Sequence, residues 1–162
     1  MKRDTVRRQN KSSALLAAIA IFALSSCGDP PKLRVDNAVL VLSPVDANPS
    51  ALYFDIHGGT QDVRLLRVVS PSIIRSEMHE SVKDQASGTV SMKPLDQIAI
   101  PARGKVIFKR GGKHVMMWGV NLRARRLGEM ETEYIFSNGD RILVDAVVQE
   151  LDGTIPDERK AL

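Results

Sequence analysis

The chain has 162 residues, of which 23 are basic and 19 are acidic, so its formal net charge at pH 7 is +4. The excess positive charge lies in the first 26 residues, which hold five of the basic residues and one of the acidic ones. The other 136 residues therefore carry 18 charges of each sign, and we predict no nucleic-acid partner for a domain so balanced. That length suits one folded domain.

The first 26 residues have the pattern of an export signal. Five basic residues precede an apolar run over residues 14–24, which is shorter than the ~20 residues that cross a bilayer as a helix. The run ends in Leu24-Ser25-Ser26-Cys27, which resembles a bacterial lipobox, in which the cysteine is lipidated and becomes the mature N-terminus. Cys27 is the only cysteine of the chain.

We therefore predict a lipoprotein signal peptide over residues 1–26, lipidation at Cys27, and a short tether over residues 27–32. The protein is then expected in the periplasm of a bacterium, anchored by its lipid to an envelope membrane. The alternative is an ordinary secretory signal followed by a free cysteine.

After the tether, short alternating or β-branched runs are separated by Gly and Pro, a pattern typical of an all-β, antiparallel β-sandwich. The predicted domain covers residues 33–151 and a polar tail covers residues 152–162. Asn138-Gly139 between two alternating runs indicates a hairpin, and residues 121–130 are predicted to be a basic, irregular loop. About eight strands are predicted, from the runs at residues 33–42, 51–57, 62–69, 73–82, 89–93, 105–110, 114–120, 131–137 and 141–151, with a short segment at residues 97–100.

Soft metal ligands concentrate in the middle of this domain. Four of the six methionines and two of the three histidines lie between residues 78 and 117. Thioether sulfur selects Cu(I), and imidazole also binds it. The alternative is that the methionines fill the core, a use favoured by the presence of only seven aromatic residues.

Strand geometry divides these residues between two faces, because side chains alternate along a strand. His114 and Met116 then share one face, whereas Met117 points to the other and is predicted to pack in the core. Trp118 shares the face of His114, where it either shields a site from water or is an ordinary half-buried aromatic. A hairpin across the turn at residues 83–88 is expected to bring His79 and Met92 to neighbouring positions.

The spacing of Met92, 21 further residues and then His114-Val115-Met116 resembles the motif of the PCuAC-type periplasmic copper chaperones. Their pattern is His-Met, about ten residues, Met, 21 residues, then His, any residue, Met. The likeness extends over about residues 33–150. It implies a cupredoxin-like Greek-key sandwich that carries Cu(I) to a copper-accepting protein. The implied acceptor is the cytochrome oxidase subunit that holds a dinuclear copper centre, with general handling of periplasmic copper as a broader role.

The chain departs from that motif in the first pair, where Met78 precedes His79. His79 also lies 13 positions before Met92, one more than usual, which an extra residue in the turn explains. We predict that His79, Met92, His114 and Met116 are the metal ligands and leave Met78 out, because on a regular strand it faces away from His79.

An enzyme is not predicted, because no nucleophile stands near Asp55 and His57, and His57 is expected to be a turn residue. A blue-copper site is disfavoured because it needs a cysteine thiolate, and Cys27 lies outside the domain.

Since thioethers carry no proton, the histidines alone should make Cu(I) binding depend on pH, weakening it below about pH 6. We expect a monomer. The alternatives are a copper store or tolerance protein, or a metal-free sandwich for adhesion or assembly.

Overall fold

The computed structural model describes residues 29–85 and 88–155. The predicted leader and Cys27 lie outside the described residues. The described residues contain ten strands where about eight are predicted: every predicted strand is present, with its ends within two residues of their predicted positions, and the short segment at residues 97–100 is also a strand. The elements are β1 (Arg34–Val41), β2 (Ser50–His57), β3 (Val63–Val69), β4 (Arg75–Lys83), β5 (Val90–Pro94), β6 (Ile98–Ile100), β7 (Lys105–Phe108), β8 (Lys113–Trp118), α1 (Leu122–Leu127), β9 (Glu129–Phe136) and β10 (Arg141–Gln149).

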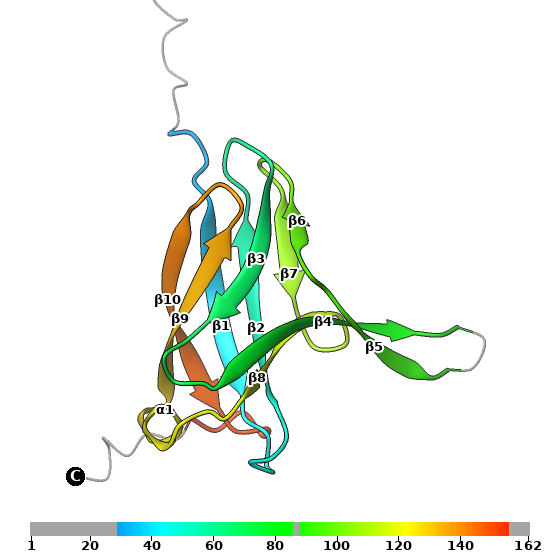
Figure 1. Cartoon of the computed structure of the whole chain (residues 1–162), viewed down its shortest axis with the longest axis vertical. Coiled ribbons are helices and arrows are strands. Elements are labelled where there is room, and N and C mark those ends of the chain that lie inside the picture. The colour runs from blue at the N-terminus through cyan, green and yellow to red at the C-terminus, as the bar shows by residue number, and fades with distance from the viewer. Residues whose placement is uncertain (1–28, 86–87, 156–162) are drawn as a thin grey trace, which may run out of the picture.

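The ten strands form one curled sheet in the order β5-β4-β8-β7-β2-β1-β10-β9-β3-β6, with an additional pairing between β8 and β2 (Figure 1). Most neighbours in this order are not consecutive in the chain, as in Greek-key folds. The predicted all-β fold is confirmed. The described sheet is mixed rather than wholly antiparallel, because β1 runs parallel to β10 and β7 runs parallel to β8.

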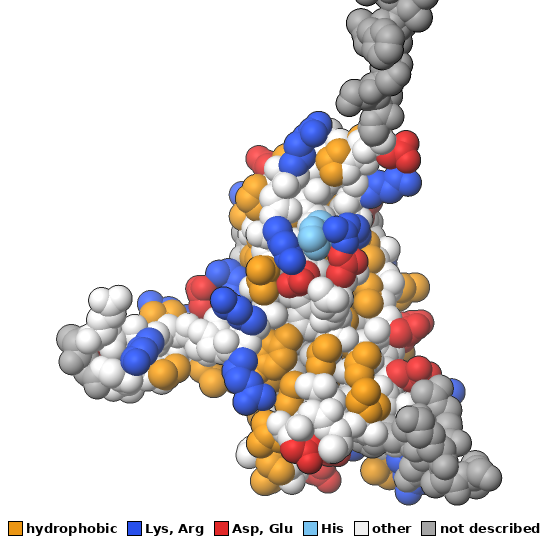
Figure 2. All heavy atoms as spheres, turned by 180° about the vertical axis from the view of Figure 1, so that it is seen from behind, with side chains coloured by type: hydrophobic (Ala, Val, Ile, Leu, Met, Phe, Trp, Pro, Cys, Tyr) orange, Lys and Arg blue, Asp and Glu red, His pale blue; other side chains and the backbone are white. Residues whose placement is uncertain are grey.

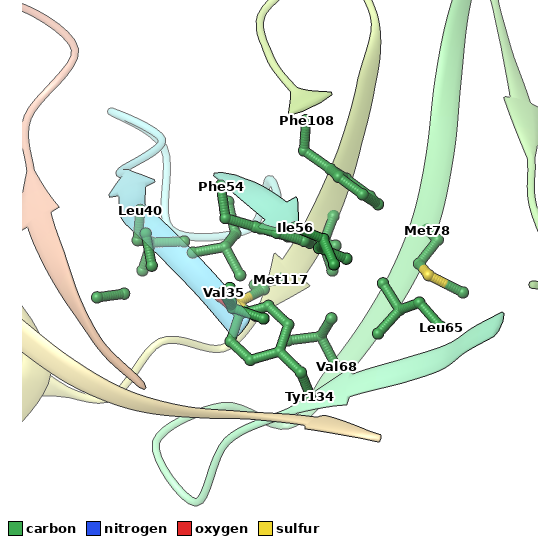
Figure 3. Close-up of a cluster of buried hydrophobic side chains, with 14 of the residues drawn as sticks. Val35, Leu40, Phe54, Ile56, Leu65, Val68, Met78, Phe108, Met117 and Tyr134 are labelled. Carbon is green, nitrogen blue, oxygen red and sulfur yellow. The ribbon is translucent and has the colours of Figure 1, made fainter. Parts of the chain in front are cut away.

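The core fills the inside of the curled sheet, and Figure 3 shows its side chains converging from opposite walls. Three aromatic rings form its centre: Phe54 stacks on Phe108 with ring centroids 4.0 Å apart, and Tyr134 meets Phe54 edge-on at 4.7 Å. Valine, leucine, isoleucine and methionine side chains complete it. The methionines among them are Met78, Met117 and Met130, so core packing, one of the two uses of methionine weighed from the sequence, occurs in this domain.

One segment departs from its prediction. Residues 122–127 form the short helix α1 rather than an irregular loop. Asn121 starts the helix because its side-chain oxygen accepts a hydrogen bond from the backbone N–H of Ala124 at 2.9 Å, and Gly128 ends it in the left-handed conformation. In the part of the chain that the structure describes, no helix is long and apolar enough to cross a membrane.

Gly58, directly after β2, is required by close packing of two loops. A Cβ atom at this position would lie 2.1 Å from the carbonyl oxygen of Pro101, and backbone atoms there have little freedom to retreat. We expect Gly58→Ala to lower the free energy of unfolding by about 1–3 kcal/mol, the usual cost of overpacking. Urea unfolding measures this change. Gly112→Ala is the control, since its Cβ would meet the Lys109 side chain at an ordinary 3.5 Å; equal unfolding midpoints for both variants would contradict the expectation.

Candidate metal centre

The two histidines of the predicted site lie directly opposite each other. Strands β4 and β8 pair antiparallel with His79 opposite His114, and residues in such a pair project to the same face of a sheet. Their ring centroids are 6.2 Å apart. From the sequence these residues are expected on separate strands of unknown relation, and only the register of β4 against β8 brings the rings together.

The two methionines lie diagonally on either side of His79. Met116 is opposite Glu77, two residues before His79 on β4, and Met92 on β5 is opposite Ser81, two residues after it. Diagonal neighbours on a sheet are roughly 7–8 Å apart at their Cα atoms, within reach of a methionine side chain. All four predicted residues therefore share one face, with His79 at the centre, although Met92 is a diagonal neighbour of His79 rather than its direct partner, which is Pro94.

Burial separates the four residues into an inner and an outer part. His114 is 5% exposed and the His79 side chain 14% exposed, and Met116 is half-buried. Met92 is 55% exposed and belongs to β5, an edge strand of the sheet, in which every residue is exposed. Figures 1 and 2 show β5 and the end of β4 projecting from the body of the protein as an arm. The inner part consists of His79, His114 and Met116, and the outer part is Met92, the solvent-exposed member.

Each histidine has one ring nitrogen available for a metal. The Nδ1 of His114 lies 3.0 Å from the carbonyl oxygen of Gly112; a carbonyl only accepts, so Nδ1 carries the proton and Nε2 keeps its lone pair. The Nδ1 of His79 is buried, and it is the one buried side-chain nitrogen or oxygen in residues 29–85 and 88–155 without a hydrogen-bond partner. An orphaned buried nitrogen is costly, and a bound soft metal ion would satisfy it.

The residues next to the histidines on β4 and β8 are divided between the two faces of the sheet, as strand alternation predicts. Met78 and Met117 are buried in the core on the opposite face of β4 and β8. Trp118 lies on the face of the histidines, where the guanidinium of Arg75 lies over its ring, 4.0 Å from the ring centroid. No group of three or more His, Cys, Asp or Glu side chains within the described ranges is placed to hold a metal ion. The candidate site is of another kind, with two imidazoles and two thioethers.

The third histidine belongs to a separate cluster. His57 is the last residue of β2, whereas the residue of β2 opposite Met116 is Ala51, near the start of that strand. Its Nε2 lies 3.3 Å from a carboxylate oxygen of Asp36. Partial burial and the positive charges of Arg34 and Lys105 lower the pKa of His57. His57 is therefore apart from the candidate site, as predicted, although it ends a strand rather than forming a turn.

Two partners of the histidines were missed in the sequence. Glu77 has a carboxylate oxygen 3.2 Å from Nε2 of His79, and it was detectable, because it lies two residues before His79 on the same strand face. The contact between His114 and the carbonyl of Gly112 could not be predicted from the sequence, since every residue has a backbone carbonyl.

Solved copper-binding domains share this fold. The copper-bound PCuAC domain from PmoF2 matches with a TM-score of 0.59 and 18% identity, over 76% of this chain and 97% of that one. The solution structure of CuI-DR1885 from Deinococcus radiodurans matches with a TM-score of 0.58 and 23% identity, over 78% of this chain and 84% of that one. The fold is that of the PCuAC domains, which confirms the cupredoxin-like prediction.

A protein family is also identified from the sequence. The model of the family described as "Putative lipoprotein LpqE-like" matches residues 33–148, which is more than two thirds of the chain. The protein belongs to this LpqE-like family. No curated protein sequence matches the chain.

Proposed function

We propose that this protein is an exported, lipid-anchored carrier of Cu(I), with His79, His114, Met116 and Met92 as its ligands. The observation that carries the proposal is the buried, partnerless Nδ1 of His79, which shares one sheet face with His114 and Met116. Thioethers and imidazoles form a soft donor set suited to Cu(I). The copper-bound domain from PmoF2 and CuI-DR1885, which share the fold, support the choice of metal.

The division into an inner and an outer part suits a carrier. The inner residues hold the ion on rigid paired strands, and the exposed Met92 occupies the side from which another protein can approach. Thioethers are neutral and need no proton to leave, so an acceptor thiolate can replace Met92 and then the inner ligands without redox chemistry. Transfer is driven by the tighter binding of Cu(I) to thiolates than to thioethers.

Titration with Cu(I) against a competing chelator tests the binding. We expect one Cu(I) per chain and much weaker binding of Zn(II), because Zn²⁺ is held by nitrogen, oxygen and thiolate ligands rather than by thioethers. If Cu(I) binds no more tightly than Zn(II), the proposal fails. The metal-free adhesion or assembly module, which is the alternative from another class, predicts that negative result.

A transfer assay then separates a carrier from a copper store or tolerance protein. The Cu(I)-loaded protein is mixed with the copper-free soluble domain of a cytochrome oxidase subunit that forms a dinuclear copper centre, the acceptor that the PCuAC resemblance implies. A carrier loses its copper to that domain. A protein that keeps its copper in this mixture, and in a mixture with other thiolate acceptors, is a store.

A further inference from the structure

A chain of contacts, one cation–π contact and two hydrogen bonds, connects Trp118 to His79 in the proposed site. The guanidinium of Arg75 lies over the Trp118 ring, 4.0 Å from its centroid. The same group donates a hydrogen bond to Glu77 at 2.8 Å, and the other carboxylate oxygen of Glu77 is 3.2 Å from Nε2 of His79. All these residues lie on one face, because Arg75 is opposite Trp118 and Glu77 is opposite Met116.

The chemistry of these contacts determines which nitrogen of His79 carries the proton. An ionised carboxylate only accepts hydrogen bonds, so Nε2 of His79 must be the donor to Glu77. In a neutral imidazole the other nitrogen, Nδ1, then keeps its lone pair. This is the buried nitrogen without a partner.

We propose that Glu77 is a positioning residue, which holds His79 as the Nε2–H tautomer so that His79 binds the metal through Nδ1. His114 is held in the opposite tautomer by the Gly112 carbonyl, and binds through Nε2. The two imidazoles thus present different nitrogens to one ion. This inference rests on the proposed function, since it assigns roles within the same site.

The arrangement of Arg75 explains how an exposed carboxylate stays in place. Glu77 and Arg75 are both about half exposed, and an ion pair in water contributes little by itself. The Trp118 ring supports the guanidinium by a cation–π contact, and the guanidinium fixes the orientation of the carboxylate. Carboxylates that orient a metal-bound histidine in this way typically account for a factor of about 10–100 in metal affinity.

The test compares Glu77→Gln with Glu80→Gln. Glu80 is on the same strand and also pairs with a cation, Lys113 at 2.6 Å, but it projects to the opposite face. Glutamine has the shape of glutamate, yet its amide can either accept from or donate to Nε2, so it no longer selects one tautomer of His79. We expect Glu77→Gln to weaken Cu(I) binding about 10–100-fold and Glu80→Gln to leave it unchanged.

Nitrogen NMR of the imidazole rings supplies a readout that a merely structural role would not change. In metal-free protein at about pH 8, where free imidazole is neutral, we expect His79 as the Nε2–H tautomer in the wild type and as a mixture in Glu77→Gln. Adding Cu(I) should shift the Nδ1 resonance of His79 and the Nε2 resonance of His114.

The inference is overturned if wild-type His79 carries its proton on Nδ1, or if Glu77→Gln matches the wild type in both tautomer and Cu(I) affinity. These results differ from the failure of the proposed function, in which the wild type itself binds no Cu(I) and neither ring resonance shifts. If the wild type binds no Cu(I), the assignment of metal-binding nitrogens is wrong as well. The spectra of the metal-free protein still report whether Glu77 selects the tautomer of His79.

Discussion

Replacing His114 by alanine and Met116 by leucine together is expected to weaken Cu(I) binding by more than ~100-fold while the fold remains. The two residues supply half of the proposed ligands, and loss of a group that merely orients a ligand already costs about 10–100-fold. Both lie on the sheet face away from the core, whose residues on β8 are Val115 and Met117. Chelator competition measures the affinity, and circular dichroism with urea unfolding measures the fold.

The matched control for this variant changes the methionines that face the core. In Met78→Leu/Met117→Leu, two thioethers are lost from β4 and β8, the strands that also carry the histidines, but from their opposite faces. Leucine conserves volume, so each change should cost less than about 1.5 kcal/mol of stability. We expect unchanged Cu(I) affinity. If this control loses copper as strongly as His114→Ala/Met116→Leu, the ligands are not the residues on the histidine face.

Phe54→Ala is expected to destabilise the fold more than any other single change considered. Phe54 is 1% exposed and contacts both other central aromatics, with ring centroids 4.0 Å away in Phe108 and 4.7 Å away in Tyr134. Removing a buried phenylalanine side chain costs about 3–5 kcal/mol, because transfer energy is lost and a cavity remains. Domains of this size are stable by only about 5–15 kcal/mol.

Urea unfolding at 25 °C, followed by circular dichroism, measures that loss as a shift in the midpoint. Ile107→Ala is the control, since Ile107 is next to Phe108 on β7 but 47% exposed, and surface changes of this kind usually stay within about 0.5 kcal/mol. Equal midpoints for the two variants would mean that the three rings do not form the centre of the core.

The same central packing connects stability to the metal site. Val115 and Met117, which alternate with the proposed ligands on β8, belong to the core cluster that includes Phe54. Because a strand directs successive side chains to opposite faces, packing these two residues inside fixes where His114 and Met116 point. The positions of the proposed ligands therefore depend on a well-packed core, although none of their side chains belongs to the core cluster.

Several features of the protein followed from sequence pattern alone. The alternation in His114-Val115-Met116-Met117 assigns two residues to the site face and two to the core, and the structure has this division. The same rule separated Met78 from His79. The ends of the strands could be predicted from Gly and Pro residues, because the backbone preferences of these residues favour turns and loops over strands. Periodicity and turn chemistry are short-range properties, and a single sequence displays them directly.

The relations between distant strands were decided only by the tertiary structure. His79 and His114 are 35 positions apart, and nothing local specifies that β4 pairs with β8 in the register that makes them opposite. The expected hairpin does make His79 and Met92 neighbours, but diagonal ones, because Pro94 is the direct partner of His79. Hairpin register depends on the length and type of the turn, and the sequence of this turn did not specify either.

Local pattern thus determined which residues carry soft donor atoms and which face of a strand each one occupies. The structure decided that His79 lies between the other three proposed ligands, that Met92 is the most exposed of them, and that Glu77 and the Gly112 carbonyl each contact one imidazole. The physical reason is that strand alternation is a property of the backbone itself, whereas pairing and register come from burying one core shared by the whole chain.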